Sequence, residues 1–114
     1  MRVDPARLQS CRKDPGSLLV RQIEALAGNR ASVTLERERP WASITFSGTR
    51  HSFAIRWTDP ADLAALQNLA TTLPDHEFAI PGHFIADLLV TEQTETHLLV
   101  EALSIIDPVE SNDR

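Results

Sequence analysis

Apolar residues recur at helical spacing in the segment that follows Asp14-Pro15. Leu19 and Ile23 lie four positions apart, as expected for one face of an amphipathic helix. Aspartate followed by proline is a typical helix start, because the aspartate caps free backbone N–H groups and proline fits the first turn. Gly28-Asn29 supplies the stop. We therefore predict a helix between these two signals.

The same start signal recurs at Asp59-Pro60 and predicts a second helix. The apolar stripe of this helix consists of Leu63, Leu66, Leu69, Ala70 and Leu73. Pro74 follows the stripe and ends the helix, because proline lacks the N–H group that a helix interior requires.

Between the two helices the apolar period changes to two, which is typical of strands with one wet face. The alternation occurs in segments 33–36, 42–46 and 53–57, which are separated by Pro40 and by Ser47-Gly48. Two more strands, 83–91 and 96–106, follow the second helix and are joined by a polar turn. The sequence therefore predicts a three-stranded meander and a later hairpin.

This element order, α-βββ-α-ββ, predicts an α+β fold, in which the helices of a two-layer domain pack on one face of an antiparallel sheet. A chain of 114 residues indicates one domain, 1–114. Within it, we expect residues 1–13 to form an N-terminal arm or a short helix and residues 109–114 to form a loose tail.

The last hairpin is apolar on both faces. Strict alternation puts Phe84, Leu88 and Val90 on one face of its first strand, and Ile85 and Leu89 on the other. The partner strand repeats the pattern, with Leu98, Val100 and Ala102 opposed to Leu99, Leu103 and Ile105. Helices of a two-layer domain cover one sheet face only, so the second face needs another cover. A second copy of the chain is the simplest cover, and we predict a homodimer with this hairpin central or at the interface.

Asp87 and Glu101 interrupt the apolar pattern of this hairpin. A three-residue loop centred on Thr94 places them directly opposite each other, whereas a shift of one residue places Asp87 opposite Val100. Facing carboxylates in a buried hairpin need an arginine partner, a shared proton or a metal. The candidate partners, which are also the candidate binding residues, are Arg37, Arg39, Arg50 and Arg56.

Three interpretations of Asp87 and Glu101 stay open: a structural ion-pair network with arginine, an acid–base or ligand-binding pair joined by His83, and simple exposure at a sheet edge. A metal is not expected, because His83 and His97 each lie roughly 13 Å along the strand from the carboxylates, too far for one ion. His51 and His76 lie near predicted turns, and we expect them to be solvated or to cap.

The charge is divided along the chain. Residues 1–60 have a formal charge of +4 and residues 61–114 a formal charge of −9, which together give the net charge of −5. The two halves either face each other within one domain or face the other half of a partner. The acidic balance also argues against a general nucleic-acid-binding protein.

Other classes of site are disfavoured by the composition. Cys11 is the single cysteine, which excludes an internal disulfide. The four glycines are scattered, so there is no phosphate-binding loop, and no cofactor is predicted. We see neither a signal-peptide pattern nor an apolar run long enough for a membrane span, and expect a cytoplasmic protein without membrane association.

Two resemblances are partial. The segment 78–84, with its Gly82-His83-Phe84, and the later Glu101-Ala102 resemble the Gly-His-Phe and Glu-Ala segments of hot-dog-fold hydroxyacyl dehydratases, whose His and Glu carry acid–base dehydration. Ile85-Ala86 stand where that family has Pro-Gly, and Glu101 falls in a strand pattern rather than a central helix. The element order also resembles that of dimeric type III secretion chaperones, small α+β proteins that bind extended effector segments.

The leading interpretation is a non-enzymatic, dimeric module that binds another protein or a small ligand. The runner-up is a small acid–base enzyme that uses Asp87, Glu101 and His83. A third hypothesis is a nucleic-acid contact through the arginine-rich strand face.

Overall fold

The computed structural model describes residues 14–107 of the chain. The helices are α2 (Pro15–Leu26) and α3 (Leu63–Thr72), and α3 is flanked by the short 3-10 helices η1 (Pro60–Asp62) and η2 (Leu73–Asp75). The strands are β1 (Ser32–Ala42), β2 (Ser47–Arg56), β3 (His83–Gln93) and β4 (His97–Ile106). The expected short helix before residue 14, Cys11 and the tail 109–114 lie outside the described residues.

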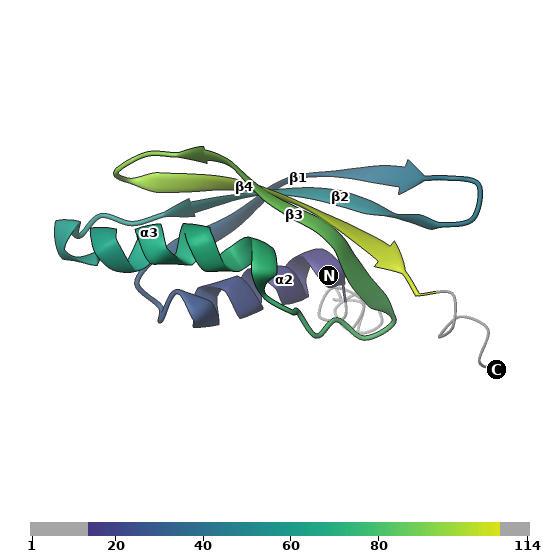
Figure 1. Ribbon diagram of the computed structural model, residues 1–114, viewed down its shortest axis with the longest axis horizontal. Coiled ribbons are helices and arrows are strands. Elements are labelled where there is room, and N and C mark those ends of the chain that lie inside the picture. The colour runs from purple at the N-terminus through teal and green to yellow at the C-terminus, as the bar shows by residue number, and fades with distance from the viewer. Residues whose placement is uncertain (1–13, 108–114) are drawn as a thin grey trace, which may run out of the picture.

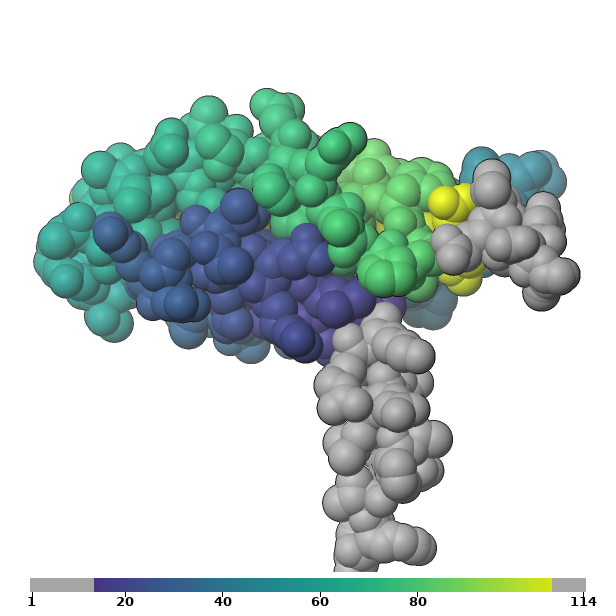
Figure 2. Space-filling model, turned by 90° about the horizontal axis from the view of Figure 1, so that it is seen from below, coloured from purple at the N-terminus to yellow at the C-terminus, as the bar shows by residue number. Residues whose placement is uncertain are grey.

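The four strands form one antiparallel sheet in the order β1-β2-β4-β3. Both helices lie on the same face of this sheet, and nothing in the described part of the chain covers the opposite face (Figure 1). Seen from the helix side, α2 and α3 lie next to each other and form most of the surface (Figure 2). The predicted α+β class, with helices on one face of an antiparallel sheet, is confirmed.

The first run of strands differs from the prediction in one detail, because two long strands replace the expected three. β1 continues through Pro40, which is tolerated because β1 is an edge strand and needs fewer backbone donors than a central one. Residues 43–46, expected as strand, form the turn between β1 and β2, in which the Ser43 N–H donates to the Phe46 carbonyl oxygen at 2.8 Å. Ile44, at the tip of this turn, is fully exposed.

The helix limits follow the sequence signals. The Asp14 side chain accepts a hydrogen bond from the Ser17 backbone N–H at 3.2 Å and caps α2. Gly28 and Asn29 end this helix with positive φ angles of 65° and 61°.

The core lies between the helices and the sheet. Leu19 and Ile23 of α2 and Leu66 of α3 are at most 1% exposed and pack against the inner sides of the strands. The inward residues of the two central strands are Phe53, Ile55, Leu98, Val100 and Ala102. Alternation in β4 is as predicted, since Leu99, Leu103 and Ile105 point to the other face.

The register of the last hairpin corrects the sequence prediction. Two bulges, at Ala86 and Thr91, interrupt β3, so Asp87 lies opposite Leu103 and Glu101 lies opposite Leu89. The prediction that Asp87 faces Glu101, and its alternative that Asp87 faces Val100, are therefore both wrong.

The first bulge also changes which β3 residues share a face. Ile85 packs with Leu88 and Val90 against the helices, whereas Phe84 lies with Leu89 on the uncovered face. The strict alternation assumed for this strand is wrong, because an extra residue at a bulge reverses the alternation beyond it.

Candidate functional site: the open face of the sheet

The uncovered side of the sheet, here called the open face, has an apolar end. One row across the strands consists of Trp41, Gly48, Ile105 and Phe84. The ring of Phe46 packs edge-on against Phe84, with ring centres 6.3 Å apart and planes at 88°. Both phenylalanines are about 40% exposed, which is unusual for adjacent aromatic side chains in a lone domain.

The half of the open face formed by β1 and β2 is basic. Four arginines project from this half: Arg37, Arg39, Arg50 and Arg56. Their positions in the paired strands alternate with those of the residues that point toward the helices. Arg39 lies directly opposite Arg50, a like-charge pair that destabilises an isolated ladder. Among the four, only Arg56 forms an ion pair with another described residue, with Glu36 at 3.6 Å.

The half formed by β3 and β4 is acidic. Asp87 is exposed and Glu101 is half-buried, and they lie on the same face at diagonal positions of the ladder. Neither forms an ion pair with any residue between 14 and 107, whereas Glu92 pairs with His97 at 2.7 Å. The two oppositely charged hairpins are therefore side by side on one face, and no ion pair among the described residues connects them across it.

His83 is not brought to the carboxylates. It shares the helix side of β3 with Ile85, while Asp87 points to the open face. Its Nδ1–H donates to the Pro81 carbonyl oxygen at 3.0 Å. The structure therefore brings Asp87 and Glu101 to one face but leaves His83 on the other side of the strand.

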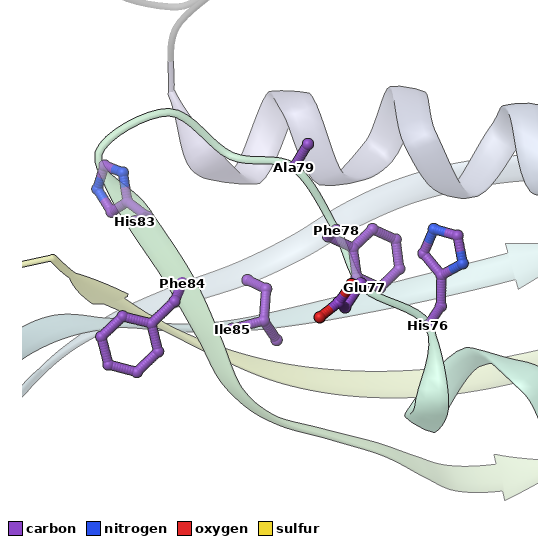
Figure 3. Close-up of a pocket in the computed structure, with 7 residues that line it drawn as sticks. All are labelled: His76, Glu77, Phe78, Ala79, His83, Phe84 and Ile85. Atoms are coloured by element: carbon purple, nitrogen blue, oxygen red, sulfur yellow. The ribbon is translucent and has the colours of Figure 1, made fainter.

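His83 instead borders a surface pocket of about 340 Å³ between residues 76–79 and the start of β3. His76 and His83 lie at opposite ends of this pocket, with Phe78 and Ile85 between them (Figure 3). The His76 ring packs against Phe78, with ring centres 4.6 Å apart. Because its polar groups do not converge, the pocket offers no arrangement for acid–base chemistry.

The most tightly connected polar group was missed by the sequence analysis. His51, which was expected to be solvated or to cap, is 0% exposed and lies on the helix side of β2. Its Nδ1–H donates to Glu38 Oε2 at 2.8 Å, and its Nε2 is hydrogen-bonded to Ser104 Oγ at 2.8 Å. The Ser104 hydroxyl also donates to the Thr49 carbonyl oxygen of β2, at 3.4 Å. His76, by contrast, is exposed as expected.

This Glu38–His51–Ser104 bridge has the hydrogen-bond order of a hydrolase triad. Ser104 is also 0% exposed, so no substrate carbonyl can approach its hydroxyl. Glu38 lies against the first turn of α2, because a side chain at Gly16 would meet its carboxylate. The bridge therefore connects β1, β2 and β4, and sets an anionic carboxylate at a helix N-terminus, where the helix dipole stabilises it.

Sequence alternation contains the signal that identifies His51 as an inward residue. His51 has the same parity as Phe53, Ile55 and Trp57, so extending the strand pattern by two residues places it in the core. Its partner Ser104 is 53 positions away, and only the β2–β4 register brings the two together.

Within residues 14–107, no three His, Cys, Asp or Glu side chains gather closely enough to hold a metal ion. Neither described helix has the length and apolar character needed to cross a membrane.

No protein-family model matches the chain, and no curated protein sequence is significantly similar to it.

Proposed function

We propose that the protein is a non-enzymatic interaction module and that the open face of its sheet is the surface that binds another protein. The observation that carries this proposal is the combination on one face of an exposed aromatic end with charged side chains that have no partner within the described chain. Interface cores are enriched in aromatic residues and arginine, and their rims are polar.

A macromolecular partner fits this face better than a small substrate does. The face is broad and built from side chains of four strands, whereas small-molecule sites are concave with a few converging polar groups. A nucleic acid fits poorly, because Asp87 and Glu101 would repel the phosphates that the arginines attract.

Site-specific photocrosslinking in cells tests the proposal. A benzoylphenylalanine replaces Leu89, which is 50% exposed on the open face, and in a matched control it replaces Gln67, which is exposed on α3. We expect a protein adduct from position 89 and none from position 67. Equal or absent adducts at the two positions would exclude the open face as a protein-binding surface.

A further inference from the structure

We infer that the partner on the open face is a second copy of this chain, stacked sheet to sheet about a two-fold axis that runs parallel to the strands between β2 and β4. This inference rests on the proposed function and names the partner of the same surface. The argument depends on the order of residues in each row across the sheet.

One charged row runs Arg39, Arg50, Leu103 and Asp87 from β1 to β3. A second copy turned over about the inferred axis presents the same row in reverse order. Arg39 then lies over the partner's Asp87, and Arg50 lies over the partner's Leu103. Each copy thereby supplies the carboxylate that the other lacks, and the repulsion between Arg39 and Arg50 is relieved.

The order of residues in the apolar row is reversed in the second copy in the same way. Its order is Trp41, Gly48, Ile105 and Phe84, so Trp41 lies over the partner's Phe84 and Gly48 lies over the partner's Ile105. Apolar side chains therefore meet apolar side chains at one end of the interface.

The alternative two-fold axis, perpendicular to the strands, is disfavoured by charge. It places β1 over β1 of the other copy and β3 over β3, so that arginines face arginines and carboxylates face carboxylates. Like-charge juxtaposition across an interface costs several kcal/mol. The division of charge between the two hairpins thus selects one of the two ways in which the sheets can stack.

The size of the face is sufficient for a small specific interface. Four strands at the usual spacing are about 19 Å wide and, at ten residues, about 30 Å long, so that two stacked sheets bury on the order of 1,000 Å² in total. That area reaches the lower limit for specific interfaces. The natural twist of each sheet gives aligned stacking with strand directions about 30° apart.

A charge-swap experiment on the purified chain tests this arrangement. Arg39→Asp and Asp87→Arg are each made alone, with Arg21→Asp on α2 and Asp75→Arg in η2 as exposed controls away from the open face. Sedimentation velocity over a dilution series gives the dimer dissociation constant, and circular dichroism confirms folding. Each single swap places two like-charge contacts in the dimer, so we expect its dissociation constant to rise about 100-fold or more. The two control variants should have the same dimer dissociation constant as the original chain.

Mixing the two single variants provides the decisive readout. One chain then carries aspartate at both positions and the other carries arginine at both, so every contact in the mixed pair joins opposite charges. We expect a heterodimer with a dissociation constant close to that of the original chain. A mixture that associates no better than its separate components would overturn the axis, and a monomeric original chain would overturn the self-association.

Failure of this inference is distinguishable from failure of the proposed function. If the original chain is monomeric but position 89 crosslinks to a different protein, the interaction module remains and the second copy is excluded. If position 89 gives no adduct, the open face itself is excluded.

Discussion

Replacing Ser104 with alanine measures what the Glu38–His51–Ser104 bridge contributes to stability. The change removes the hydroxyl that bonds His51 Nε2 at 2.8 Å, and the ring is 0% exposed, so water cannot take its place. A buried polar atom that loses its partner costs about 1–3 kcal/mol. We therefore expect Ser104→Ala to lower the free energy of unfolding by about 1–3 kcal/mol.

Urea unfolding followed by tryptophan fluorescence is a suitable assay, because Trp57 is buried and its signal changes when the core opens. All variants are compared at one protein concentration, since association would shift apparent stability. Ser32→Ala, at an exposed position at the start of β1, is the matched control and should change stability by less than about 0.5 kcal/mol.

A second substitution separates the effect of losing the hydrogen bond on stability from the effect of losing side-chain volume. Adding His51→Leu to Ser104→Ala removes the orphaned ring, while Glu38, which is 36% exposed, can turn to water. The double variant should be no less stable than Ser104→Ala alone, because replacing both partners by apolar groups is close to neutral. If Ser104→Ala lowers the free energy of unfolding no more than Ser32→Ala does, the bridge contributes nothing to stability and the reasoning fails. A fluorophosphonate probe should leave Ser104 unmodified because its hydroxyl is buried, and labelling there would contradict that burial.

Two further variants test the local geometry. Gly48→Ala places a methyl group on the Ser104 carbonyl oxygen of β4. We therefore expect the free energy of unfolding in urea to fall by about 3 kcal/mol or more, or soluble folded protein to be lost. An unchanged unfolding midpoint would contradict the close approach of the two strands. Asp14→Ala should lower the free energy of unfolding by about 1 kcal/mol through loss of the α2 cap, whereas Asp14→Asn should retain most of the stability that the cap provides. Equal losses in the two variants would show that the carboxylate charge matters more than the hydrogen bond.

The parts of the fold that follow from short-range chemistry were predictable from the sequence. Asp14-Pro15, Gly28-Asn29 and Asp59-Pro60 fix helix limits through capping and φ preferences that act within a few residues. The inward residues of β4 also followed from alternation, because this strand has no bulge.

The register of the last hairpin could not be predicted, because neither bulge in β3 carries a glycine or proline signal. Ala86 and Thr91 are ordinary strand residues, and each shifts the pairing by one position. The candidate site depends on this register, since it decides that Asp87 and Glu101 share a face without facing each other. The distribution of charge was visible in the sequence, but its placement on one face required the strand order β1-β2-β4-β3.

The two outer strands have a consequence for how far assembly can proceed. Pro40 removes a backbone donor from β1, and the bulges of β3 break the regular spacing of its free edge. Strand addition in the plane of the sheet is therefore hindered at both margins, so copies cannot readily join edge to edge into fibrils. If copies stack on the open face as inferred above, the assembly is complete after one partner has bound, because each copy has one such face.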